Sequence, residues 1–253
     1  MKEYIIAQNQ NIMRYHDFPG KETPILFIHG LGCAGSFDFP DVAAQAELVG
    51  HRRILIDLLG SGFSDKPDDF SYTVKDHVDY LYGFVHELNL QSFIIFAHSL
   101  GGPIGIELAK RCGDQVTALV LSESNLDPSS VGSSSYDFGT CKEEDFVSQM
   151  FEEVVEKSTL KNSMWAATLS VCSPKAMHRI SQSAVVGGNP SWRNLLYSLT
   201  CKRTFIFGAE SLPDDDKIEL ERHEIQIEIV PSAGHSMAWE NPKGLANAIK
   251  KSV

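Results

Sequence analysis

A chain of 253 residues is long enough for one large α/β domain, or for a core domain that carries an insertion. Its content of 43% hydrophobic and 22% charged residues is ordinary for a globular protein. The formal net charge of −11 argues against nucleic acid and anionic membrane surfaces as partners, because both require basic patches.

The cysteines of the chain suggest neither a zinc site nor a disulfide framework. There are five, an odd number, without C-x-x-C spacing. The N-terminus carries an acid early and lacks a sustained apolar core, so we expect no signal peptide. No apolar run approaches the length of a bilayer span. We therefore expect a cytoplasmic protein with reduced cysteines and no membrane partner.

Short apolar runs alternate with helical patterns along most of the chain. Residues 1–17 alternate loosely and end at Pro19-Gly20, which indicates a peripheral antiparallel hairpin. Apolar stripes predict a helix ending at Gly50, another over about 73–88 and a last one from about Pro242. The predicted buried strands are residues 24–30, 53–57, 93–96, 116–122, 204–208 and 225–230. This alternation predicts a doubly wound, mostly parallel α/β sheet with helices on both faces.

The alternation stops between two of the predicted strands. Residues 129–199 show helical patterns without strands, which indicates a helical cap over the sheet edge where parallel strands end. We expect residues 1–128 and 200–253 to form the core. The large apolar residues of the cap either line an apolar pocket or pack the cap against the core. They are Phe146, Met150, Phe151, Met164, Trp165 and Met177.

The sharpest local signal is a serine between a buried strand and a helix. Ser99 stands at that turn, with a small residue two positions before it and a glycine two positions after it. The segment reads Ala97-His98-Ser99-Leu100-Gly101 and corresponds to the nucleophile elbow, usually written G-x-S-x-G. Alanine at the first small position adds one methyl group, which the turn can accommodate.

A serine hydroxyl becomes a useful nucleophile only when a base takes its proton, and histidine is the usual base. His235 follows the last predicted strand, so its loop lies at the same sheet edge as Ser99. We predict that His235 is the base. We expect His98 to point away from it, packing or lining a pocket, and His29 to brace its loop by hydrogen bonds.

Over essentially its whole length the sequence resembles the α/β-hydrolase superfamily. The resemblance rests on the elbow, on His29-Gly30-Leu31-Gly32, on Asp57–Ser64 and on Ala233-Gly234-His235, in that order around the strand ends. It implies an oxyanion hole formed by the backbone N–H groups of Leu31 and Leu100.

The acid of the triad departs from the family pattern. The resemblance implies an Asp after the strand 204–208, in the pattern G-x-x-D, but Ser211 occupies that position. Some members of the superfamily take their acid from the end of the preceding strand, where this chain has Glu123. A carboxylate at a buried strand end needs a partner such as an imidazolium. We favour Glu123 and keep Glu210 as the alternative acid.

A serine nucleophile points to acyl transfer. We therefore expect a serine hydrolase acting on a small, partly apolar ester, lactone or related carbonyl compound through a Ser-His-Glu triad. A C–C bond hydrolase or lyase on the same scaffold, or a non-enzymatic ligand-binding protein, remains an alternative. No metal-ligand spacing or dinucleotide fingerprint is present, so we expect no metal and no cofactor, and the oligomeric state stays open.

Overall fold

The computed structural model describes residues 1–253, and its strands form a single eight-stranded sheet in the order β1-β2-β4-β3-β5-β6-β7-β8. The first pair, β1 and β2, is antiparallel, as is β2 with β4, whereas all other neighbours are parallel. This confirms the predicted mostly parallel sheet with a hairpin at its edge. The strands are β1 (Lys2–Ile5), β2 (Ile12–Phe18), β3 (Glu22–Ile28), β4 (His51–Ile56), β5 (Phe93–His98), β6 (Val116–Ser122), β7 (Lys202–Gly208) and β8 (Gln226–Val230).

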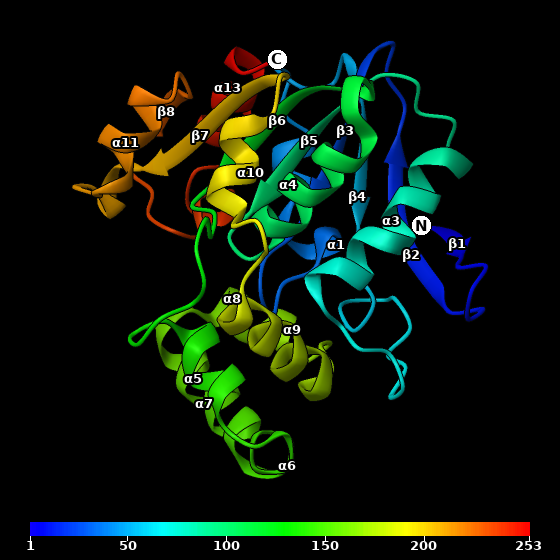
Figure 1. Ribbon diagram of the computed structural model, residues 1–253, viewed down its shortest axis with the longest axis vertical. Helices are drawn as coiled ribbons and strands as arrows, with labels where there is room; N and C mark the ends of the chain where they lie inside the picture. The colour runs from blue at the N-terminus through cyan, green and yellow to red at the C-terminus, as the bar shows by residue number, and fades with distance from the viewer.

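Helices cover both faces of this sheet, as Figure 1 shows. None of them is long and apolar enough to cross a membrane. The helices of the core are α1 (Gly35–Asp38), α2 (Pro40–Ala43), α3 (Val74–Glu87), α4 (Gly101–Cys112), α10 (Trp192–Ser198), α11 (Asp216–Arg222), α12 (Met237–Glu240) and α13 (Pro242–Lys251). One predicted helix, ending at Gly50, is shorter than expected. After α2 the chain makes successive tight turns instead, with the Gln45 N–H donating to the Val42 carbonyl.

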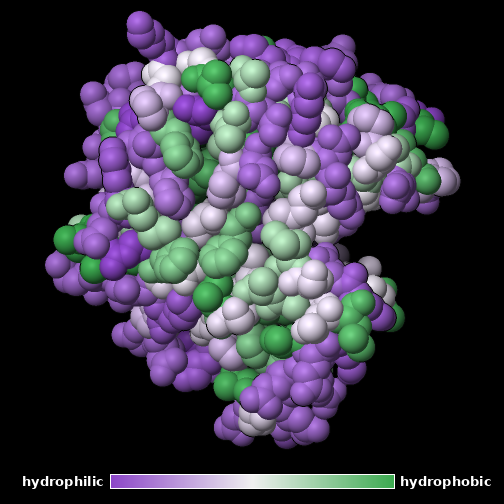
Figure 2. Space-filling model, turned by 180° about the vertical axis from the view of Figure 1, so that it is seen from behind, coloured by the Kyte–Doolittle hydropathy of each residue, from purple (hydrophilic) through white to green (hydrophobic).

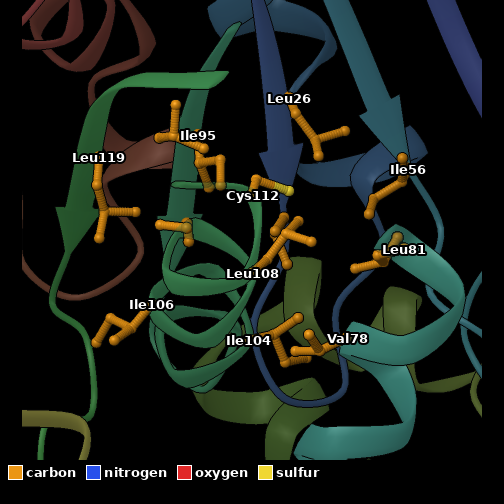
Figure 3. Packing of buried hydrophobic residues seen from close by; sticks show 14 of the residues in the cluster. Leu26, Ile56, Val78, Leu81, Ile95, Ile104, Ile106, Leu108, Cys112 and Leu119 are labelled. Carbon is orange, nitrogen blue, oxygen red and sulfur yellow. The ribbon is translucent and has the colours of Figure 1, made fainter. Parts of the chain in front are cut away.

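Alternate residues of the buried strands point to opposite faces. In β3, Leu26 and Ile28 belong to the larger apolar cluster, which α3, α4 and α10 complete, whereas Ile25 and Phe27 belong to the cluster on the face of α2 and α13. Figure 3 shows the larger cluster, with Leu26, Ile95 and Leu119 of the strands meeting residues of α3 and α4. Each such side chain contributes about 1.5–3 kcal/mol of burial free energy.

The remaining helices gather beyond one edge of the sheet (Figure 1), and we refer to this group as the cap. Helix α10 falls within the predicted cap range 129–199 but packs against α4 of the core instead. They are α5 (Ser134–Thr140), α6 (Glu143–Asp145), α7 (Phe151–Lys161), α8 (Ser163–Leu169) and α9 (Pro174–Val186), with a π-helical turn at Phe146–Met150. The cap has its own small apolar cluster, formed by Phe138, Phe146, Leu169 and Met177. Phe146 and Met177 therefore pack the interior of the cap.

The central strand β5 generates a stability prediction. Ile95 is fully buried against α4, so Ile95→Ala should lower the free energy of unfolding by about 2–5 kcal/mol, measured by urea denaturation. Ile218 of α11 is 59% exposed, and Ile218→Ala should change it by less than about 0.5 kcal/mol. Equal losses in the two variants would contradict this description of the core.

Candidate active site

Ser99 lies between β5 and α4 in a left-handed backbone conformation, with φ of 51°. The strand and helix approach closely beside it. A Cβ atom at Gly101 would lie 2.3 Å from the His29 carbonyl oxygen, so only glycine fits there. The methyl group of Ala97, which replaces the usual glycine, is accommodated by Gly105, where a Cβ would lie only 2.8 Å from it. A glycine one turn along α4 thus compensates for the alanine in the elbow.

The loop between β8 and α12 brings a histidine to this serine. His235 Nε2 lies 3.1 Å from Ser99 Oγ, within hydrogen-bond distance, although the two residues are 136 positions apart in the sequence. The His235 side chain is 57% exposed. Its other nitrogen, Nδ1, lies 3.9 Å from Glu123 Oε2. That distance is long for a hydrogen bond, but such contacts often tighten when substrate binds.

Glu123 directly follows β6, and its side chain is only 11% exposed. Its backbone also has a positive φ, 45°, and its Oε1 accepts a hydrogen bond of 2.8 Å from the Gly208 N–H. Burial alone would raise the pKa of this carboxyl group, but contacts with His235, Gly208 and the Ser211 hydroxyl together lower the pKa below its usual value. Glu123 is therefore held ionised beside the imidazole. Ser211, at the position where the resemblance implies an Asp, lies against it.

The alternative acid lies elsewhere. Glu210 is exposed, and no ion pair within 4.0 Å joins it to His235. Of the two candidate carboxylates, the structure thus brings only Glu123 to the imidazole.

Two further histidines lie near Ser99. The expectation that His98 points away from His235 is wrong, because their rings lie 4.8 Å apart between centroids. The side chain of His98, the residue before Ser99, turns toward β6. Its Nδ1 lies 3.1 Å from the Ser122 carbonyl oxygen and 2.9 Å from the Ser122 hydroxyl. Burial, reinforced by His235, lowers the pKa of His98 to about 3, so its ring stays neutral.

His29 braces the loop after β3. Its Nδ1 donates to the carbonyl of the next residue, Gly30, at 2.9 Å, and its Nε2 accepts from the Leu58 N–H at 3.0 Å. It links the two loops that follow β3 and β4.

A cavity of about 550 Å³ opens above Ser99. It borders Glu123, His235, His98, Leu31 and Leu100. Neither the Leu31 N–H nor the Leu100 N–H donates a hydrogen bond to another group of the protein. The two residues that carry these free backbone donors therefore border the same cavity as the serine. Figure 2 shows that the surface is hollowed between the cap and the part of the core that carries α11 and β8.

The large apolar residues of the cap contribute little to the cavity wall. Of the six large apolar residues considered, only Trp165 borders it, and Met164 is 47% exposed. Trp239 supplies a second aromatic ring. Hydroxyl and amide groups form much of the remaining wall, from Ser124, Ser133, Ser134, Ser135, Ser236, Asn125 and Asn162.

One titratable wall residue was missed from the sequence, because it lies in the short helix α1 and belongs to no recognised motif. Asp38 is 3% exposed, and its Oδ1 has no hydrogen-bond partner. Burial raises the pKa of this carboxyl group to about 8, although its contacts with Cys33 and Ala34 oppose the rise. Burial therefore favours the protonated, uncharged form of Asp38 near neutral pH.

Comparisons with known proteins agree with this architecture. A family model described as alpha/beta hydrolase fold matches residues 23–196. An esterase from Thermogutta terrifontis has a TM-score of 0.80 at 20% identity, over 99% of this chain and 97% of that chain. A carboxylesterase from Nitrososphaera gargenis reaches 0.81 at 18% identity, with the same coverage. The N-acyl homoserine lactonase AidH, complexed with N-hexanoyl homoserine lactone, reaches 0.73 at 18% identity, again over 99% and 97%.

Curated relatives match over shorter stretches. Probable lysophospholipase BODYGUARD 3 of Arabidopsis thaliana is 40% identical over 102 residues, which are 38% of this chain and 20% of that protein. Cis-3-alkyl-4-alkyloxetan-2-one decarboxylase of Shewanella oneidensis is 31% identical over 123 residues, 47% of this chain and 38% of that protein. The match thus spans less than two fifths of these relatives' own length.

The protonated state of Asp38 gives a pH prediction. Between about pH 4 and 8 the unfolded chain has lost a proton that folded Asp38 retains, so this group lowers the free energy of unfolding as pH rises through that window. The amide introduced by Asp38→Asn cannot titrate. The stability of this variant relative to wild type should therefore increase from pH 5 to pH 8, by at most about 1.4 kcal/mol per pH unit. Urea denaturation at each pH measures this, and a difference that stays constant would contradict it.

Proposed function

Because this chain belongs to the α/β-hydrolase fold family, we propose that it is a serine hydrolase acting on small, partly apolar esters, lactones or related carbonyl compounds. The observation that carries the proposal is the 3.1 Å contact between Ser99 Oγ and His235 Nε2 at the floor of the cavity. A nucleophile within hydrogen-bond distance of its base is the arrangement that covalent acyl transfer requires.

In the proposed reaction, Ser99 Oγ attacks the substrate carbonyl carbon while His235 Nε2 takes the hydroxyl proton. The carbonyl oxygen becomes an oxyanion, and the free N–H groups of Leu31 and Leu100 donate to it. His235 then gives its proton to the leaving alcohol, and an acyl-enzyme forms on Ser99. A water molecule, deprotonated by His235, then attacks this ester. The tetrahedral intermediate collapses to the carboxylic acid and expels Ser99 Oγ, which takes back the proton from the His235 imidazolium.

Glu123 has the supporting role in this proposal. Its ionised carboxylate faces His235 Nδ1 at 3.9 Å and stabilises the imidazolium that forms during each step. The Gly208 N–H fixes the carboxylate from the other side, so that it holds the ring in the orientation that presents Nε2 to Ser99.

The residues of the cavity wall support the proposed substrate class. The rings of Trp165 and Trp239 suit an apolar acyl or alcohol part, and the surrounding hydroxyl and amide groups suit a polar one. Two kinds of comparison support a carboxylic ester or lactone as the substrate. The fold neighbours include esterases and a lactonase, and some relatives are named as probable lysophospholipases.

A second candidate function is C–C bond cleavage or lyase chemistry. The relative named as an oxetanone decarboxylase, 31% identical over 123 residues, favours it. The two reactions differ in whether an acyl-enzyme accumulates, since a lyase need not form one. A non-enzymatic binding protein is less well supported, because it has no need of a serine held within hydrogen-bond distance of a base.

The nucleophile assignment predicts burst kinetics. With short-chain p-nitrophenyl esters, the wild-type protein should release one equivalent of nitrophenol rapidly before steady turnover if deacylation is the slower step. It should also react covalently with a fluorophosphonate probe, detected by mass spectrometry. Ser99→Ala should lose the labelling and the burst, and its turnover should fall by at least about 10⁴-fold. If the wild-type protein shows neither turnover nor labelling, the proposal is wrong.

The acid assignment is tested by a matched pair of neutral substitutions. Glu123→Gln keeps the shape of the side chain but removes its charge, so kcat should fall by about 10²–10⁴-fold. Glu210→Gln makes the same chemical change in an exposed side chain and should leave kcat within about twofold of wild type. The opposite result would transfer the role to Glu210.

A further inference from the structure

The cap helix α8 is hydrogen-bonded to the loop that follows β3. Trp165 Nε1 donates to the Leu31 carbonyl at 3.0 Å. Thr168 Oγ1 lies 2.8 Å from the Gly32 carbonyl and 2.8 Å from the Trp165 carbonyl of its own helix, and the two carbonyls share its single proton. Thr168 is fully buried, so its hydroxyl has no access to solvent. One short helix of the cap therefore holds two successive carbonyl groups of the loop that carries the Leu31 N–H.

This contact is also tightly packed. Gly32 has a φ of +67°, and a Cβ atom there would lie 2.7 Å from Leu169 Cδ2 and 2.9 Å from Trp165 Nε1. The loop therefore approaches α8 as closely as glycine allows. Because packed interfaces resist small displacements, the backbone at Leu31 has little freedom to shift while α8 stays in place.

The N-terminal end of the same helix reaches the loop of the base. Asn162 caps α8 by accepting a hydrogen bond from the Trp165 N–H, and its Nδ2 donates to Ser236 Oγ at 3.2 Å. Ser236 directly follows His235 in the chain. The helix thus touches the loops on two sides of Ser99, although nothing in α8 itself contacts Ser99 or His235 by a hydrogen bond.

We propose that α8 is a positioning element for the reaction, in which Trp165 and Thr168 fix the Leu31 loop so that its N–H meets the developing oxyanion. This inference rests on the proposed function. Donors that stabilise a transition state are effective only when they are held in place before the reaction. A shift of about 1 Å in such a group can cost on the order of 10²-fold in rate. Docking of the cap and completion of the oxyanion hole are then one structural event.

The decisive variant is Trp165→Phe, which keeps an aromatic ring at this position but removes the indole N–H together with part of the ring. The control below, Trp192→Phe, makes the same truncation elsewhere and so separates the loss of ring volume from the loss of the hydrogen bond to Leu31. Because the oxyanion exists only in the transition state, kcat and kcat/KM for p-nitrophenyl butyrate should fall together by about tenfold, with KM within about twofold of wild type. The affinity for phenylboronic acid, which forms a tetrahedral anion on the serine, should fall by a similar factor. Thr168→Val should act in the same direction, and Thr168→Ser, which restores the hydroxyl, should recover the activity.

Trp192→Phe is the matched control. Its indole N–H donates to Glu107 Oε1 at 2.8 Å, and neither residue borders the cavity, so kcat, KM and boronate affinity should stay at their wild-type values. Two results in Trp165→Phe would each overturn the inference: an increase in KM at unchanged kcat, or an unchanged boronate affinity. In either case α8 would only dock the cap against the core. Absence of ester turnover by the wild type would instead overturn the proposed function on which the inference rests.

Discussion

The close approach of β5 and α4 beside Ser99 is the constraint on which the rest of the site depends. Gly101 lies where any side chain would strike the backbone of the residue that follows β3, and Gly105 makes room for the Ala97 methyl group. The strand can therefore pass directly into the helix, with Ser99 forced into a left-handed conformation at the turn. That conformation costs on the order of 1–3 kcal/mol and is maintained by the packing around it. The position of the Ser99 hydroxyl at the cavity wall is therefore a product of backbone sterics.

The parallel sheet then determines which other groups can reach that hydroxyl. Loops that follow β3, β5, β6 and β8 all leave the sheet at the same edge, so residues far apart in the chain become neighbours. Glu123 follows β6, Ser99 follows β5 and His235 follows β8. The neighbouring strand β7 contributes the Gly208 N–H, and the turn that follows it contributes the Ser211 hydroxyl, and both contact the Glu123 carboxylate. A buried carboxylate at this edge requires such partners, and the sheet register supplies them.

Because the site is built from the ends of neighbouring parallel strands, part of it could be predicted from the sequence. The strands, the elbow and the nearness of His235 to Ser99 follow from local patterns and from the order of strand ends, both visible in the sequence. The direction of the His98 ring was predicted wrongly, because it depends on a hydrogen bond to Ser122 on a neighbouring strand. Similarly, an apolar residue of the cap has the same sequence pattern whether it faces a cavity or packs inward, as Phe146 and Met177 do. Asp38 carries no motif, and its burial results from tertiary packing alone.

The electrostatics of the cavity follow from the same burial. Cys33, Asp38 and His98 all border it, and desolvation disfavours the charged form of each: it raises the pKa of Cys33 and of Asp38 and lowers the pKa of His98. At neutral pH these three groups are uncharged. Glu123 differs, because its hydrogen-bonding partners outweigh desolvation and keep it ionised. Because these groups carry no charge, none of them competes with the Glu123 carboxylate for the His235 imidazolium. For the same reason, none of them repels an oxyanion that forms above Ser99. The charges that acyl transfer creates would therefore interact mainly with one another and with fixed backbone dipoles, in surroundings where such interactions are stronger than in water.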